Sequence, residues 1–87
     1  MPLNFSNPSR SYDPTRVAVR FYGYDSSMEA SFFITQDALS KLAGRGVSGE
    51  SDGLASFDAN RARIYEVAGT VYGRGRKGSY ELVRSDF

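Results

Sequence analysis

The sequence has 87 residues, of which 40% are hydrophobic and twelve are aromatic (six Phe and six Tyr), and its formal net charge is +1. A chain of this length folds as one domain with a modest core, because it can bury only about 60–65% of its unfolded surface. The absence of cysteine and histidine excludes disulfides and thiolate chemistry and removes the commonest general base and metal ligand.

Residues 1–14 contain all three prolines together with several Asn and Ser residues. This composition is typical of an extended arm rather than of a helix or a regular strand, with Leu3, Phe5 and Tyr12 as its anchors. The arm lacks the basic start and apolar run of a secretory signal, and the chain has no apolar stretch of the roughly 18–20 residues that a membrane span needs. We therefore expect a soluble cytoplasmic protein that does not contact a membrane.

Two alternating segments follow the arm. Apolar and polar residues alternate over residues 15–22 and again from Met28 to Ile34, which is the period of a half-buried strand. The residues between them, 23–27, have turn chemistry. The pattern predicts an antiparallel hairpin in which Val17 and Val19 lie on the buried face.

A short helix is predicted after the hairpin. Thr35 has the side chain of an N-cap, Asp37 lies in the first turn, and Gly44 can end the helix in the left-handed conformation. Residues 45–53 contain three further glycines, so they are predicted to form a mobile loop.

The stretch 54–72 is the segment best suited to a long helix, with Ser51 or Asp52 as its predicted N-cap. At about 100° per residue, one face of this helix is apolar. That face carries Leu54, Phe57, Ile64, Tyr65, Ala68, Val71 and Tyr72.

Arg61 lies near the middle of this apolar stripe, where a charge is unfavourable unless it is paired. The favoured interpretation is a structural ion pair with Asp13 on the arm or Asp86 near the C-terminus, since a guanidinium can clamp a carboxylate and carbonyl groups together. Two alternatives stay open: a side chain that reaches solvent at the edge of the stripe, or a small-anion site beside the helix.

A third alternation covers residues 79–84, which gives the order β-β-α-α-β. We expect a single α+β domain over residues 1–87. Its sheet is predicted to be antiparallel and three-stranded, or four-stranded if the arm adds a strand, with two helices packed on one face.

Tyr22 and Phe33 fall on the strand face opposite the predicted core, and Tyr24 lies beside them. Uncovered aromatic side chains often mark a contact surface. The sequence therefore favours a non-enzymatic module that binds an unknown protein partner or a second copy of itself. It offers no catalytic constellation, so no catalytic residue, cofactor or metal site is predicted.

The alternative function is weak nucleic-acid binding. Arg74, Arg76 and Lys77 alternate with glycine between Tyr72 and Tyr80, and single strands are bound by basic loops with aromatic neighbours. A solvated turn is the simpler interpretation, because phosphate-dominated binding usually requires more basic residues. The chain also matches G-x-G-x-x-G twice, but neither match lies between a strand and a helix as a dinucleotide site requires.

Four stretches resemble a small bacterial family known as domain of unknown function 1488. They are Leu3 to Asp13, the hairpin after it, the pattern Phe57-x-x-x-Arg61-x-x-Ile64-x-x-x-Ala68, and the closing GSYELVRSDF. The resemblance implies a compact α+β domain in the bacterial cytoplasm and assigns no catalytic or binding residue. It also implies that the segment equivalent to Gly44–Gly53 is shorter or more helical, which leaves the start of the long helix open.

Overall fold

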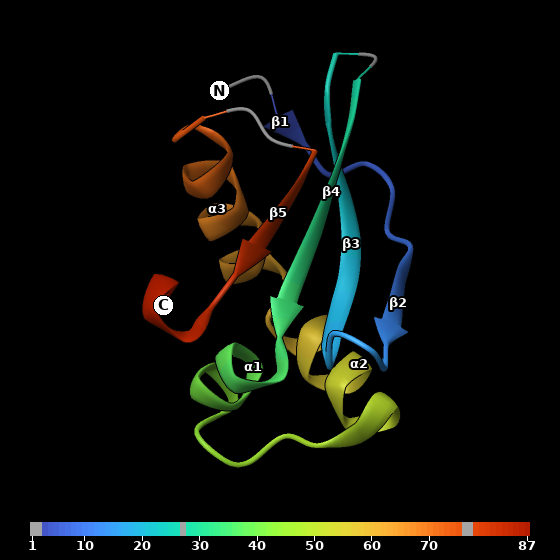
Figure 1. Ribbon diagram of the computed structural model, residues 1–87, viewed down its shortest axis with the longest axis vertical. Coiled ribbons are helices and arrows are strands. Elements are labelled where there is room, and N and C mark those ends of the chain that lie inside the picture. Colours follow the sequence, from blue (N-terminus) through green and yellow to red (C-terminus); the bar gives the residue numbers. More distant parts are fainter. Residues whose placement is uncertain (1–2, 27, 76–77) are drawn as a thin grey trace.

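The computed structural model describes residues 3–26, 28–75 and 78–87 and has an α+β fold in which a mixed five-stranded sheet carries helices on one face (Figure 1). The predicted α+β class is confirmed, but the sheet is mixed rather than antiparallel and has more strands than the three or four predicted. In the described part of the chain the elements are β1 (Leu3–Asn4), β2 (Arg10–Asp13), β3 (Ala18–Asp25), β4 (Met28–Thr35), α1 (Gln36–Ala43), α2 (Gly49–Ala59), α3 (Arg61–Tyr72), β5 (Ser79–Leu82) and a short 3-10 turn, Arg84–Asp86.

The N-terminal arm is part of the sheet. Both β1 and β2 pair antiparallel with β3, at Asn4↔Tyr24 and Tyr12↔Val19 among other positions. Because β4 occupies the other edge of β3, the arm forms one interrupted edge strand. The expectation that the arm holds no regular strand is therefore wrong, and the alternative in which the arm adds to the sheet holds, with two short strands in place of one. The residues between β1 and β2, with Pro8 among them, account for the interruption, since proline cannot donate to a ladder.

The predicted hairpin is confirmed, since β3 and β4 pair antiparallel along their whole length. Both strands end later in the sequence than predicted, at Asp25 and Thr35, so the predicted turn at residues 23–27 begins too early. Gly23 lies inside β3, and the described part of the turn is Ser26, with a φ of 57°. Gly23 is needed within the strand because the arm packs closely against its backbone.

Val17 does not lie on the buried face. It precedes β3, is 42% exposed and has a φ of 52°. The cause is a turn before the strand, in which Asp13 Oδ1 accepts hydrogen bonds from the backbone N–H groups of Thr15 (2.9 Å) and Arg16 (3.1 Å). The strand thus starts three residues later than the alternation predicted.

The last strand, β5, pairs with β4 in the parallel direction, at Phe32↔Tyr80 and Ile34↔Leu82 among other positions. The prediction of an antiparallel sheet is wrong for this strand. A tight hairpin imposes antiparallel pairing, whereas a long helical crossover permits parallel pairing, and the whole of α1, α2 and α3 lies between β4 and β5.

Both predicted ends of α1 are confirmed. The Thr35 side chain accepts a hydrogen bond from the backbone N–H of Ala38 (3.1 Å), as an N-cap does. Gly44 follows the helix with a φ of 71°, which glycine adopts without the steric penalty of a Cβ.

The single long helix of the prediction is two helices, α2 and α3, that meet at Asn60. This residue leaves the helical region (φ −122°, ψ 20°), and its side-chain Nδ2 donates to the carbonyl of Ser56 (2.8 Å). An Asn side chain that bonds to the backbone competes with the helix in this way. The predicted apolar face is nevertheless confirmed, since Phe57, Ile64 and Ala68 are fully buried.

The start of α2 also differs from the prediction. Its N-cap is Ser48, rather than Ser51 or Asp52, so the second half of the expected loop is helical. Two acidic residues in the first turn favour this start. Asp52 Oδ2 accepts the backbone N–H of Ser48 (3.2 Å), and its carboxylate pairs with Arg45 (2.9 Å), while the buried Val47 fixes the approach to the helix.

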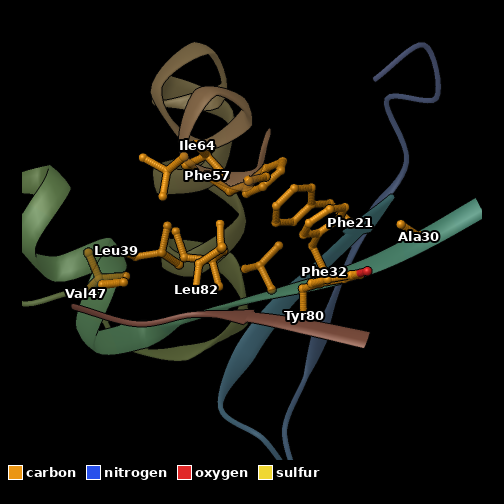
Figure 2. Close-up of a cluster of buried hydrophobic side chains, with 14 residues drawn as sticks. Phe21, Ala30, Phe32, Leu39, Val47, Phe57, Ile64, Tyr80 and Leu82 are labelled. Atoms are coloured by element: carbon orange, nitrogen blue, oxygen red, sulfur yellow. The ribbon is translucent and has the colours of Figure 1, made fainter. Parts of the chain in front are cut away.

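The core lies between the sheet and the helices (Figure 2). Phe21, Phe32 and Tyr80 point from the strands toward Phe57 and Ile64 on the helices. The buried hydrophobic side chains of α1, α2 and α3 all join this one cluster. Among the described residues, none of these side chains packs on the opposite face of the sheet.

Candidate functional site

The sheet face turned away from the core is termed the outer sheet face. Successive strand residues alternate between faces, so burial of Phe21 and Phe32 on one side places their strand neighbours on the other. The outer sheet face is formed by Arg20, Tyr22, Tyr24, Glu29, Ser31, Phe33, Ser79 and Glu81.

Two arginines and two aromatic rings stack at the centre of this face. The Arg16 guanidinium carbon lies 4.1 Å from the ring centre of Phe33. The Arg20 guanidinium carbon lies 5.2 Å from the ring centre of Tyr22 and 5.6 Å from that of Phe33. At these distances a guanidinium group is attracted to the face of the aromatic ring by the ring's quadrupole. The stack orders side chains that would otherwise be mobile.

Arg20 has fewer partners than a guanidinium can bind. Its Nη2 donates to Ser31 Oγ at 3.3 Å, and its Nε is buried without a hydrogen-bond partner among the described residues. No carboxylate in the described part of the chain pairs with it, whereas Arg10, Arg45 and Arg61 each pair with an aspartate. The buried Nε is enclosed by the protein's own atoms, which is unfavourable and puts this donor out of a partner's reach. The Nη1 group and the second Nη2 hydrogen have no partner among the described residues, and these donors can bind one from outside.

The three residues predicted to form a contact surface lie on the outer sheet face. They differ in exposure. Phe33 is only 6% exposed because Arg16 and Arg20 cover it, so its predicted exposure is wrong. Tyr22 and Tyr24 are half-buried.

Tyr24 is held in place by two hydrogen bonds. Its hydroxyl accepts from Asn7 Nδ2 (3.3 Å) and donates to Glu29 Oε2 (3.0 Å). Arg16 and Arg20 were not among the predicted contact residues, because alternation alone marks them only as polar positions of a strand. Arginine interleaved with tyrosine on one strand face was the available signal.

Arg61 is ionically paired, but not with either predicted aspartate. Its Nη2 bonds to Asp58 Oδ1 (2.8 Å) and to the Pro8 carbonyl (3.0 Å), and its Nη1 donates to the Tyr65 hydroxyl (2.6 Å). The side chain is 27% exposed. The break at Asn60 turns Arg61 toward the arm, where Asp58, one turn back, is the nearest carboxylate.

The two predicted partners of Arg61 have other roles. Asp13 closes the turn before β3, as described above. Asp86 accepts the backbone N–H of Val83 (2.8 Å) and pairs with Arg74 at 3.4 Å.

Asp58 joins the arm to the helices. Arg10 Nη2 approaches Asp58 Oδ2 to 2.7 Å and Arg10 Nε approaches Oδ1 to 3.0 Å, a bidentate pair between β2 and α2. Arg61 binds the same carboxylate. These hydrogen bonds, that of Arg10 foremost, lower the pKa of Asp58.

Asp58→Asn is expected to lower the free energy of unfolding at neutral pH by about 1 kcal/mol, a value reduced for the partial exposure of the pair. The folded-state pKa of Asp58 is lowered, so its contribution is complete above its unfolded-state pKa of about 3.9 and is lost as pH falls through the folded-state value. Urea unfolding at a series of pH values should show the gap between wild type and variant closing below about pH 3.9. A gap that stays constant in acid would contradict this origin.

The predicted basic patch is only partly within the described residues. Arg76 and Lys77 lie outside them. Arg74 is largely exposed and pairs with Asp86. The two tyrosines expected to offer stacking surfaces do not both do so, because Tyr80 is 4% exposed and the Tyr72 hydroxyl donates to Asp25 Oδ2 (2.7 Å).

No three acidic side chains in residues 3–26, 28–75 and 78–87 converge as a metal site would require. Among the helices described for this chain, none has the length and apolar character to cross a membrane.

Comparison with known proteins bears on the fold. The family model described as "Protein of unknown function (DUF1488)" matches residues 3–83. The fold is also similar to the crystal structure of a protein of unknown function from the DUF1488 family of Shewanella loihica PV-4, with a TM-score of 0.82. That likeness covers 93% of this chain and 91% of the other at 20% sequence identity, which shows a shared fold. The search of curated proteins gave no match.

Proposed function

Because this chain belongs to the DUF1488 family, whose description assigns no activity, we propose its function from its surfaces: a non-enzymatic module that binds an acidic protein segment on the outer sheet face. The segment carries an Asp or Glu carboxylate that pairs with Arg20. The observation that carries the proposal is the Arg20 guanidinium, which lies over the rings of Tyr22 and Phe33 and has no carboxylate partner among the described residues.

Charge and residue type support this partner. Arginine and tyrosine are the side chains most enriched among the residues that dominate binding energy at protein interfaces. A planar guanidinium binds a carboxylate through two parallel hydrogen bonds. Arg20 is ordered by its stack on Tyr22 and Phe33 before any partner arrives, which reduces the entropy lost on binding.

The flanks of the face limit which segments fit. Glu29 and Glu81 lie on the outer positions of β4 and β5. They repel a uniformly acidic partner. The preferred segment therefore has one carboxylate at its centre and an apolar or aromatic residue beside it to cover Tyr22.

The test is a selection of random twelve-residue peptides displayed on phage against the immobilised protein. We expect the enriched peptides to share an Asp or Glu, and to bind Arg20→Met at least about tenfold more weakly, the loss of one charge-assisted contact. Arg63→Met is the matched control, since Arg63 pairs with Glu66 on the exposed face of α3. Arg20→Lys, which keeps the charge without the planar fork, serves if the methionine variant does not fold.

Peptides that bind Arg20→Met as well as wild type would overturn the proposal, as would a selection that enriches no carboxylate. A dimer held through Tyr22 and Arg20, measured by sedimentation velocity, would assign the face to a second copy of the chain instead and would equally overturn it.

A further inference from the structure

A second surface lies on the helix side of the molecule, between the arm and the junction of α2 and α3. It is an open groove of about 640 Å³. Its walls come from segments far apart in sequence and include Phe5, Pro8, Arg10, Asp58, Arg61 and Tyr65.

The charged side chains of the groove carry a net positive charge, because two arginines share one carboxylate. Arg10 and Arg61 share the single carboxylate of Asp58, so the three side chains sum to +1. Arg10 donates hydrogen bonds to Asp58 from its Nε and from one hydrogen of its Nη2. A guanidinium has five N–H donors, so the Nη1 group of Arg10 stays without a partner among the described residues. The cluster thus has hydrogen-bond donors to spare.

The wall beside these donors is aromatic and rigid. Phe5 and Tyr65 stack with ring centres 4.2 Å apart and an angle of 5° between the planes. The Tyr65 hydroxyl accepts from Arg61 Nη1 (2.6 Å), which leaves its own hydrogen free to donate. An anion in the groove would meet donors from both arginines and from this hydroxyl, with the stacked rings of Phe5 and Tyr65 alongside.

We infer that this groove is a binding site for a small phosphate monoester that carries a planar ring. The phosphate oxygens accept hydrogen bonds from the N–H groups of Arg10 and Arg61 that have no other acceptor. The planar guanidinium group favours such contacts with phosphate. The ring lies against the Phe5 and Tyr65 wall. Asp58 positions both guanidiniums rather than contacting the ligand, because a carboxylate repels a phosphate. This site lies on the opposite side of the sheet from the proposed peptide surface and does not depend on it.

The experiment is a titration of the full chain with phenyl phosphate at constant ionic strength, followed by NMR of the backbone amides and the arginine Nε–H groups. We expect saturable shifts at Arg10, Arg61 and Tyr65. Inorganic phosphate should bind at least about threefold more weakly, since it buries no ring. Sodium chloride at the same ionic strength should produce no saturable shift.

Variants separate the site from general charge. Arg10→Gln should weaken phenyl phosphate binding at least about tenfold, and Tyr65→Phe should weaken it without loss of the ring stack. Arg63→Gln, on the same helix but outside the groove, should bind within about twofold of wild type. The amide spectrum of each variant establishes that it is folded, and Arg10→Lys replaces Arg10→Gln if the latter is not.

Equal binding by wild type and Arg10→Gln would overturn the inference, and so would shifts that do not saturate. Arg20→Met should leave phenyl phosphate binding unchanged, and Arg10→Gln should leave the affinity for selected peptides unchanged. Failure of one assignment is therefore distinguishable from failure of the other.

Discussion

Phe21→Ala is expected to lower the free energy of unfolding by about 3–5 kcal/mol, the usual effect of replacing a large buried ring with a cavity. Phe21 is 1% exposed, and its ring centre lies 5.1 Å from that of Phe57, 5.2 Å from Phe32 and 5.9 Å from Tyr65. It therefore joins the sheet to both α2 and α3. Removal of this ring weakens contacts that no neighbouring side chain can replace.

Urea unfolding measures this effect, and Phe21→Leu is the control. Leucine fills most of the same volume, so the loss should stay below about 2 kcal/mol. A loss of under about 1 kcal/mol for Phe21→Ala would contradict the packing described here. Because Phe21 and Arg20 point to opposite faces of β3, Phe21→Leu should also keep its affinity for peptides selected on the outer sheet face.

Gly23→Ala is expected to destabilise the protein by about 1–3 kcal/mol through overpacking. A Cβ at this position would lie 2.8 Å from Phe5 Cε1 and 3.2 Å from both Leu3 Cδ1 and Phe32 Cε1. The arm would have to move away from β3 to make room. Since Phe5 is also a wall of the groove, the same substitution should weaken phenyl phosphate binding.

Gly69→Ala is the matched control for this substitution. A Cβ at Gly69 would meet no heavy atom within 4 Å, and the residue lies inside α3, where alanine is favoured over glycine by about 0.5–1 kcal/mol. We expect this variant to be more stable than wild type. If Gly23→Ala proved as stable as Gly69→Ala in thermal unfolding, the close contact between the arm and β3 would be wrong.

Local signals in the sequence predicted the parts of the fold that depend on neighbouring residues. Thr35 and Gly44 mark the two ends of α1, and alternation located both strands of the hairpin. The helical periodicity identified Phe57, Ile64 and Ala68 as side chains of α2 and α3 that reach the core, but it missed Val67. Each of these depends on backbone geometry within a few residues, which composition and spacing reveal.

The parts that failed depend on how distant segments meet. The direction of β5 is set by the crossover through three helices rather than by its own residues. The partner of Arg61 depends on the break at Asn60, and the Arg10 pair with Asp58 spans 48 residues of sequence. A pairing of this kind leaves no mark on periodicity, so the carboxylate that joins the arm to the helices could not be identified from spacing.

The exposure of the outer sheet face also depends on contacts that the alternation pattern does not reveal. Alternation placed Tyr22 and Phe33 on it, but the cover over Phe33 comes from Arg16, in a turn that the pattern took for a strand. The arginines place two guanidinium groups over the aromatic surface, and Glu29 and Glu81 flank it. The expected partner thereby changes from any apolar surface to one that carries a carboxylate.

The assignment of the outer sheet face is tested by the affinity of a selected acidic peptide for wild type, Arg20→Met and Arg63→Met, measured by isothermal titration calorimetry at one ionic strength. We expect a loss of at least about tenfold for Arg20→Met and less than about twofold for Arg63→Met. Equal losses in the two variants would reduce the interaction to net charge, and an unchanged affinity in Arg20→Met would contradict the assignment of the outer sheet face as the binding surface.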